Sequence, residues 1–226
     1  MSALILFDFD GTLADTAPDL VAAANRQRTR QGLDPHAYEP LRAVASQGAR
    51  GLLRVALGMT PSDEAFEQTR QQFLEDYAAA STVHSHLFPG IADLLDDIRR
   101  RGMSWGIVTN KATSLTLPIV EFLGLKEDCA ALVCGDTLDR AKPHPDPLLH
   151  AAQLAGYTPK QCIYVGDDLR DVQAARAAGM PVIAAAYGYL GEDADVTTWE
   201  ADAQADTPDA LWAAIESLLP SPASVA

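Results

Sequence analysis

Residues 3–12 are Ala3-Leu4-Ile5-Leu6-Phe7-Asp8-Phe9-Asp10-Gly11-Thr12, an apolar run that ends in two carboxylates and a glycine. An apolar run this short predicts a buried strand of a parallel sheet. Open α/β sheets bind their ligands beyond the carboxyl ends of the strands, which is where Asp8 and Asp10 stand. Gly11 allows a tight turn and Thr12 adds a hydroxyl, so both are candidates for a binding loop.

The two carboxylates are the first candidate catalytic pair. Asp8 and Asp10 are two positions apart, so their side chains can face the same side of an extended chain. Close carboxylates repel each other unless a cation or a shared proton offsets the repulsion. Such a pair can hold Mg²⁺, with one aspartate as nucleophile and the other transferring protons. The structural alternative is a turn or a helix N-cap, where Asp and Gly are also common.

Apolar runs and helical patterns alternate along the rest of the chain. Further strands are predicted at 105–108, 131–134, 162–165 and 182–185, and helices at 91–101, 114–122, 148–155, 171–178 and 209–219. Strands that alternate with helices predict an α/β fold, here a doubly wound parallel sheet with helices on both faces.

Residues 17–86 break this alternation. They contain no convincing strand pattern, and helices are predicted at 20–30, 50–57 and 64–77. We therefore expect an all-helical cap domain at 17–86, inserted into a catalytic core formed by 1–16 and 87–226. The hinges are expected near 15–17 and 86–90.

Composition excludes several classes of partner. The 226 residues carry 17 basic and 31 acidic side chains, a net charge of -14. This charge argues against nucleic acid and anionic membrane surfaces as partners, but not against a small anionic substrate bound beside a metal. The three cysteines are an odd number without a CxxC pair, and no signal peptide or long apolar span is evident. A cytoplasmic monomer or homodimer is expected.

Two polar sites follow the second strand and the third. Thr109 and Asn110 end the strand at 105–108, where a hydroxyl and an amide can donate to phosphate oxygens; the same pair also begins many turns. Lys142 precedes Pro143 in a polar loop. Proline fixes the backbone beside the lysine, which suits a side chain held inward, although most loop lysines are solvated.

A second group of carboxylates follows the fourth strand. Asp167 and Asp168 come directly after Gly166, and Asp171 lies three residues beyond Asp168. Carboxylates behind a buried strand again suit Mg²⁺. The alternative for part of this group is that Asp168 caps the next helix.

Together these four motifs resemble those of the haloacid dehalogenase superfamily of phosphohydrolases, in the expected order and over nearly the whole chain. The helical insertion resembles the mobile cap of that superfamily. Within it, the chain is similar to the phosphoglycolate phosphatase branch. The stretches 83–90, 105–111, 166–171 and 187–189 further resemble N-acetylmuramic acid 6-phosphate phosphatases, which serve bacterial cell-wall recycling.

The resemblance implies a Mg²⁺-dependent phosphomonoester hydrolase. Asp8 would attack phosphorus and form an aspartyl-phosphate, and Asp10 would act as acid and then base. Thr109 and Lys142 would bind the transferring oxygens, and Gly11, Thr12 and Asn110 would be further phosphate- or substrate-binding residues. The implied metal ligands are Asp8, the backbone carbonyl of Asp10, and Asp167, with Asp168 or Asp171 assisting.

The substrate is expected to be a small phosphorylated metabolite with a carboxylate. N-acetylmuramic acid 6-phosphate is favoured over phosphoglycolate, and a phosphomutase of the same superfamily is a further alternative. Arg50 could bind the substrate carboxylate from the cap, and Lys111 could reach the mouth of the pocket; a solvated Arg50 is an equal alternative. A dehalogenase is disfavoured because that family lacks an acid at the position of Asp10.

Overall fold

A parallel β-sheet forms the centre of the protein, in a computed structural model that describes residues 2–191 and 194–219. Within these residues the sheet contains β1 (Leu4–Phe7), β4 (Ser104–Val108), β5 (Leu132–Val133), β6 (Cys162–Gly166), β7 (Val182–Ala185) and β8 (Ala203–Ala205). Their order is β5-β4-β1-β6-β7-β8, and all neighbours are parallel. The predicted α/β class is confirmed.

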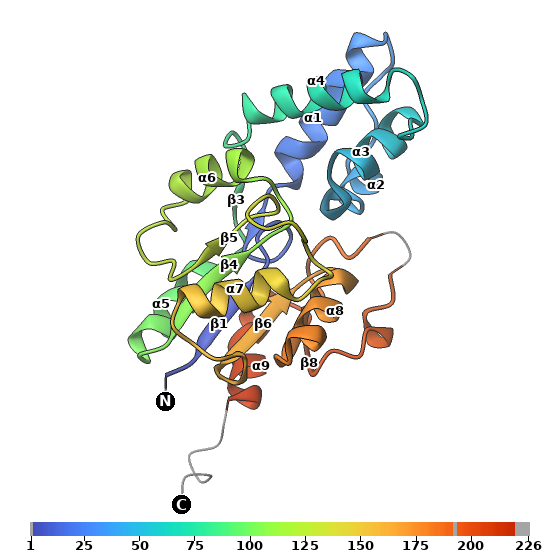
Figure 1. Ribbon diagram of the computed structural model, residues 1–226. Coiled ribbons are helices and arrows are strands. Elements are labelled where there is room, and N and C mark those ends of the chain that lie inside the picture. The colour runs from blue at the N-terminus through green and yellow to red at the C-terminus, as the bar shows by residue number, and fades with distance from the viewer. Residues whose placement is uncertain (1, 192–193, 220–226) are drawn as a thin grey trace, which may run out of the picture.

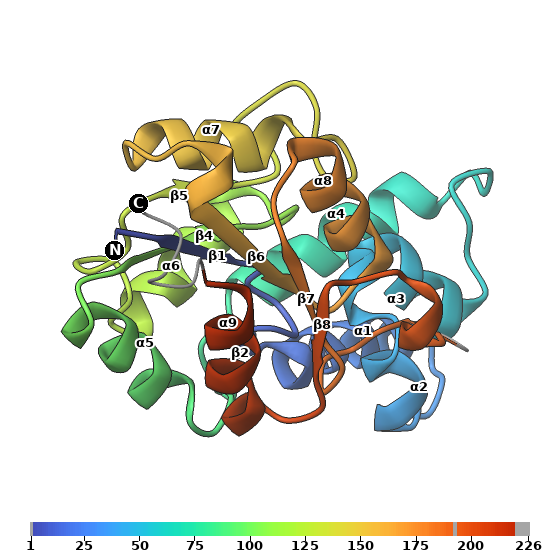
Figure 2. The same ribbon diagram turned by 90° about the horizontal axis from the view of Figure 1, so that it is seen from below.

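Helices cover both faces of this sheet (Figures 1 and 2). The helices α7 (Asp146–Leu154) and α8 (Leu169–Ala178) lie on one face, and α5 (Ile91–Arg100) and α9 (Leu211–Leu218) lie on the other. The alternation of side chains along β1 explains the two layers. Leu4 and Leu6 belong to the buried cluster under α7 and α8, whereas Ile5 and Phe7 belong to the larger cluster that includes α5 and α9.

Four helices form a separate block beyond the carboxyl ends of the strands (Figure 1). They are α1 (Ala17–Arg30), α2 (Tyr38–Arg42), α3 (Gly48–Leu57) and α4 (Phe66–Ala78). The chain enters this block after β2 (Ala14–Asp15) and leaves it before β3 (His86–Leu87), and these two short strands pair antiparallel. The two crossings therefore lie side by side. We propose that α1–α4 are a cap that moves on this pair of linkers.

Several elements differ from the sequence-based expectation. The strand β8 was not expected, because Ala203-Gln204-Ala205 has neither an apolar run nor β-branched residues. The five-residue helix α2, which contains Pro40, was also not expected. The helix predicted to start at Asp171 starts at Leu169. By contrast, α6 (Thr113–Phe122) agrees with the helix predicted at 114–122.

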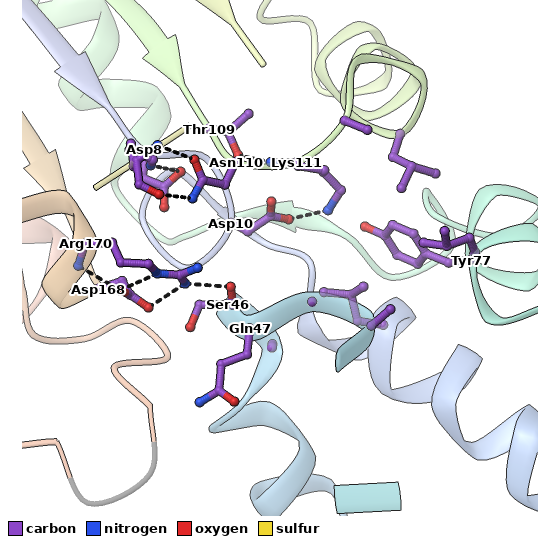
Figure 3. A pocket seen from close by; sticks show the side chains of 18 of the residues that line it. Asp8, Asp10, Ser46, Gln47, Tyr77, Thr109, Asn110, Lys111, Asp168 and Arg170 are labelled. Atoms are coloured by element: carbon purple, nitrogen blue, oxygen red, sulfur yellow. Dashed lines mark hydrogen bonds and ion pairs between the residues drawn. The ribbon is translucent and has the colours of Figure 1, made fainter. Parts of the chain in front are cut away.

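Three observations complete the description. All three cysteines are free thiols. Among the residues that the structure describes, no helix has both the length and the apolar character needed to cross a membrane. The carboxyl end of β1, which is followed by Asp8, faces the cap. The candidate site therefore lies between the two parts of the chain (Figure 3).

Candidate active site

The polar residues identified in the sequence meet at the ends of three neighbouring strands. β1 is flanked by β4 on one side and by β6 on the other. Asp8 follows β1, Thr109 follows β4 and Asp167 follows β6. Because the carboxyl ends of adjacent parallel strands share one edge of the sheet, these residues converge although they are far apart in sequence.

Lys142 is buried and ion-paired with two of the carboxylates. Its Nζ lies 2.9 Å from Asp8 Oδ1 and 2.7 Å from Asp171 Oδ1. It also donates to the Val108 carbonyl oxygen at 2.9 Å and to the Tyr164 hydroxyl at 2.8 Å. Burial works against the ammonium charge, but the two carboxylates outweigh it and raise the pKa of Lys142 above its ordinary value. Lys142 is thus a fixed cation beside Asp8.

Asp8 itself lies at the floor of the site. Its Oδ1 accepts the Phe9 N–H at 2.7 Å. Burial raises the pKa of Asp8 to about 7, against the opposing charge of Lys142. The protonated form of a carboxyl group is a poor nucleophile. Further positive charge near Asp8 would favour the ionised form that can attack.

Asp8, Asp167 and Asp171 form a cluster of buried carboxylates. Each contributes an oxygen that lies within 4.8 Å of the other two. Both oxygens of Asp171 are already engaged, since Oδ1 faces Lys142 and Oδ2 accepts the backbone N–H of Asp168 at 3.0 Å. Asp171 therefore serves to hold Lys142 in place.

Asp167 has only neutral partners. It accepts the Thr12 hydroxyl at 2.9 Å and the Tyr189 N–H at 2.8 Å. Within residues 2–191 and 194–219, Asp167 has no ion-pair partner. Burial, with repulsion from Asp8 and Asp171, raises its pKa well above the usual range.

These contacts fit a divalent cation. Three ionised carboxylates would outnumber the single ammonium group of Lys142, so the cluster can accept a further positive charge. Its donors are all oxygens, which is the set that Mg²⁺ prefers. Asp8 and Asp167 are the carboxylates with capacity left, and we propose that they hold Mg²⁺ together with the Asp10 carbonyl.

The structure does not bring Asp168 into this cluster. Asp168 is the N-cap of α8, where its side chain accepts the Arg170 N–H at 2.9 Å. It also forms an ion pair of 2.7 Å with the Arg170 guanidinium. Although burial disfavours its charge, Arg170 lowers the pKa of Asp168 below the usual range. Asp171, not Asp168, therefore lies beside the expected metal ligands, because it sits one helical turn further on and points back to the strand end.

Asp10 is held by two donors, and both bind the same carboxylate oxygen. Lys111 Nζ is 2.5 Å from Asp10 Oδ1, and the Thr16 hydroxyl donates to the same atom. Burial opposes the charge of Lys111, but Asp10 and the Tyr77 hydroxyl group outweigh it and raise the pKa of Lys111 above its ordinary value. Among the described residues, Oδ2 of Asp10 has no donor, so it is the oxygen left to face a reacting group (Figure 3).

The remaining predicted residues divide into two groups. Thr109 and Asn110 line the cavity. The Asn110 amide is nevertheless used to fix the loop of Lys142, since it donates to the Lys142 carbonyl at 2.9 Å and accepts the Lys142 N–H at 3.0 Å. Gly11 and Thr12 support Asp167 instead of lining the cavity. Gly11 has a φ of +85°, and a Cβ there would collide with the Asp167 carboxylate.

A cavity of about 330 Å³ opens between these residues and the cap. Its core side is polar. Its cap side is largely apolar, with Leu20 of α1 and with Phe73, Leu74 and Tyr77 of α4. Tyr77 also lies against the core, because Lys111 Nζ is 4.7 Å from the centre of its ring. The cavity is thus open to solvent, with a charged wall on the core side and a largely apolar wall on the cap side.

Arg50 is not part of this cavity. It is exposed on α3 and does not line the cavity. The arginines that do line it are Arg70 of α4 and Arg170 of α8. Sequence reasoning missed both, because nothing in the sequence shows which face of α4 turns toward the core. The motif Gly166–Asp171 was recognised, but the arginine within it was not assigned a role.

The chain is similar in sequence to known hydrolases and phosphatases. A sequence model of the haloacid dehalogenase-like hydrolase family matches residues 5–185. The N-acetylmuramic acid 6-phosphate phosphatase of Pseudomonas putida is 41% identical over 215 residues, which cover 95% of this chain and 96% of that protein. The phosphoglycolate phosphatase of Xanthomonas campestris pv. campestris is 44% identical over 208 residues, or 92% and 94% of the two chains.

A solved structure shows the same fold. The crystal structure of a predicted phosphoglycolate phosphatase from Haemophilus somnus superposes with a TM-score of 0.82 at 27% identity, covering 94% of this chain and 97% of that one. The fold and these relatives define a hydrolase. The chain belongs to the haloacid dehalogenase-like hydrolase family.

Proposed function

We propose that the protein is a Mg²⁺-dependent phosphomonoester hydrolase that acts through a phosphorylated Asp8, and that its substrate is N-acetylmuramic acid 6-phosphate. The catalytic part of the proposal rests on the cluster around Asp8. The substrate rests on one observation, which is that the cap side of the cavity is lined by apolar side chains and by Arg70.

The chemistry runs in two displacements at phosphorus. An oxygen of Asp8 attacks phosphorus, the ester P–O bond breaks, and Asp10 gives its proton to the leaving alkoxide. Asp10 then takes a proton from water, whose oxygen attacks phosphorus and releases inorganic phosphate and free Asp8. Bound Mg²⁺ would supply positive charge that offsets the repulsion between the Asp8 carboxylate and the phosphate dianion.

Lys142 contributes a fixed positive charge near the transferring oxygens, and Thr109 contributes a hydroxyl. The three N–H groups of the Lys142 ammonium already face four acceptors, so its contribution is charge and not a new hydrogen bond. Lys142 is held by four partners and Thr109 by its place at the end of β4, so neither needs to reorganise during the reaction. Lys111 and the Thr16 hydroxyl hold one oxygen of Asp10, which fixes the direction of the other oxygen toward the leaving group.

The cap wall favours a substrate larger than phosphoglycolate. Pockets of about 300 to 1,000 Å³ bury most of the surface of a drug-sized ligand, and this cavity measures about 330 Å³. N-acetylmuramic acid 6-phosphate carries acetyl and lactyl methyl groups and a sugar face that can pack on Leu20, Phe73 and Leu74. Phosphoglycolate has no apolar group to bury there.

Arg70 is our candidate for the receptor of the lactyl carboxylate. It lies on α4, one turn before Phe73, and lines the cavity. Its present partner is Glu67, at 2.6 Å in an exposed ion pair. Exposed ion pairs contribute little to stability, so Arg70 can exchange Glu67 for a substrate carboxylate.

We predict that Arg70→Ala raises KM for N-acetylmuramic acid 6-phosphate. Losing a charge-assisted hydrogen bond costs about 1.5 to 3 kcal/mol, which corresponds to roughly 10- to 150-fold. Hydrolysis of p-nitrophenyl phosphate, which has no carboxylate, should change little. Arg50→Ala is the matched control, because Arg50 is a cap arginine outside the cavity. Equal losses on both substrates, or a larger loss for Arg50→Ala, would remove Arg70 from this role.

The function is tested by measuring inorganic phosphate release from a set of esters. The set contains N-acetylmuramic acid 6-phosphate, 2-phosphoglycolate and hexose phosphates, each with and without Mg²⁺. We expect the highest kcat/KM for N-acetylmuramic acid 6-phosphate. A higher value for 2-phosphoglycolate would favour the activity for which the Xanthomonas relative is named. A phosphomutase would instead return the phosphate to the sugar and release little of it.

A further inference from the structure

The loop that follows β7, residues 187–189, contacts the metal site, both cap linkers and the cap itself. Tyr187 and Tyr189 are bulky and mostly buried, with Gly188 between them. None of the three lines the cavity, so the loop touches no substrate. Its contacts instead join Asp167 to the part of the chain that covers the site.

The first contact is with Asp167. The Tyr189 N–H donates to Asp167 Oδ2 at 2.8 Å. Gly188 lies so close that a Cβ at this position would overlap the Asp167 side chain. The loop backbone therefore sets the orientation of the carboxylate that we propose as a metal ligand.

The second contact is with the first linker. The Tyr189 hydroxyl accepts the N–H groups of Thr16 at 2.8 Å and Ala17 at 2.9 Å, and it donates to Asp15 Oδ1 at 2.9 Å. The first N–H groups of a helix have no partner within the helix. The N-terminus of the first cap helix thus donates to a core tyrosine, and the Ala17 N–H also donates to Asp15 Oδ1 at 3.2 Å, whereas the Thr16 side chain does not cap the helix.

Tyr187 makes the equivalent contact with the second linker. Its ring packs edge-on against Phe88, with the ring centres 5.2 Å apart, and its hydroxyl donates to the Thr12 carbonyl at 2.8 Å. The loop therefore touches the chain on both sides of the cap. It also touches the turn that carries Gly11 and Thr12.

The third contact is with Arg42, the last residue of α2 in the cap. Its guanidinium donates to the carbonyl oxygens of Gly188 at 3.2 Å and Tyr187 at 3.4 Å, and it lies 5.1 Å from the centre of the Tyr189 ring. The Gly188 carbonyl and the Tyr189 N–H belong to the same planar peptide group. One end of that group faces the cap arginine and the other faces Asp167.

We propose that Arg42, acting through the Gly188–Tyr189 peptide group, is a positioning residue that couples docking of the cap to the binding of the cation at Asp167. Arg42 polarises the peptide group and fixes its plane, which strengthens and aligns the N–H donated to Asp167. Coupling of this kind is reciprocal, so cation binding at Asp167 must favour the docked cap by the same factor. The inference rests on the proposed metal site.

The test is the affinity of the protein for Mg²⁺, measured by titration calorimetry without substrate. Arg42 touches no proposed metal ligand, yet Arg42→Ala should weaken Mg²⁺ binding by about 5-fold or more, within the usual range for coupled sites. Arg42→Lys keeps the charge but not the forked geometry of the guanidinium. Its affinity for Mg²⁺ should therefore lie between those of the wild type and Arg42→Ala. Arg50→Ala, at an exposed cap arginine of α3, should bind Mg²⁺ as the wild type does.

A second readout follows the cap directly. Hydrogen exchange at the N–H groups of Thr16 and Ala17 should slow when Mg²⁺ is added to the wild type. In Tyr189→Phe, which retains the ring and the N–H to Asp167, that response should be lost although Mg²⁺ still binds. Tyr157→Phe is the control, because the Tyr157 hydroxyl bonds Ser104 at the opposite end of the sheet.

Two outcomes overturn the coupling. One is Mg²⁺ affinity within twofold of wild type in folded Arg42→Ala and Arg42→Lys. The other is an unchanged exchange response in Tyr189→Phe. Either result leaves the proposed function standing if phosphate esters are still hydrolysed. Conversely, a protein that shows the coupling but releases no phosphate from any ester retains this inference and loses the hydrolase.

Discussion

Asp8→Asn should abolish the hydrolysis of phosphate esters while the protein still folds. An amide is a poor nucleophile and a weaker ligand for Mg²⁺, so one substitution removes two functions. Loss of the nucleophile from other enzymes with a covalent intermediate lowers kcat by about 10⁶-fold, and we expect a loss of that order. Phosphate release from purified protein measures it, and the thermal unfolding midpoint shows that the fold is retained.

Asp168→Asn is the matched control for this variant. Asp168 is also an aspartate that follows a strand of the same site, but it caps α8 and pairs with Arg170. Asparagine caps a helix about as well as aspartate, so most of the activity should remain. If Asp8→Asn kept activity within tenfold of the wild type, or if Asp168→Asn were as inactive, the assignment of the nucleophile and its metal partners would be wrong.

Asp10→Asn should slow both displacements, because one carboxylate serves as acid and then as base. The contribution of a general acid or base is typically about 10²- to 10⁴-fold. The loss should be larger for sugar phosphates, whose alkoxide must be protonated, than for p-nitrophenyl phosphate, whose leaving group needs little protonation. The ratio of kcat/KM on the two substrates measures this difference.

Lys111→Met is a useful companion to Asp10→Asn. Lys111 holds one oxygen of Asp10 but takes no part in the proton transfers. Lys111→Met should therefore lower kcat/KM less than Asp10→Asn does. The decrease should be seen with both the alkyl and the aryl ester. If Asp10→Asn lowered kcat/KM equally for the alkyl and the aryl ester, the role of Asp10 as the acid would be contradicted.

The chain predicts the fold well where apolar runs are continuous. The first strand and its carboxylates follow from residues 3–12, and the parallel sheet follows from the runs that end at Val108 and Val165. These strands are buried on both faces, so a continuous apolar run is enough to predict each of them. By contrast, β8 is an edge strand of three residues, and its Ala-Gln-Ala sequence carries no such run.

The parts of the site that depend on long-range contacts could not be predicted in this way. The choice between Asp168 and Asp171 depends on where α8 starts, which is a matter of one helical turn. The choice between Arg50 and Arg70 depends on how α3 and α4 pack. The hydroxyl of Tyr189 meets Thr16 across 173 positions of sequence. No local pattern in a single sequence specifies such contacts.

The central claim is that the phosphoryl group passes through Asp8, and trapping that intermediate tests it most directly. In Asp10→Asn, p-nitrophenyl phosphate should accumulate it, because this leaving group needs little protonation while hydrolysis of the phosphorylated enzyme lacks its base. The protein is mixed with p-nitrophenyl phosphate and Mg²⁺, quenched in acid during the first turnover and reduced with borohydride, which converts an acyl phosphate to an alcohol. Mass spectrometry of the peptide that contains residues 3–12 should then find homoserine at position 8. Phosphate release that proceeds with Asp8 unmodified at every time point, or a modified residue elsewhere, would contradict the account.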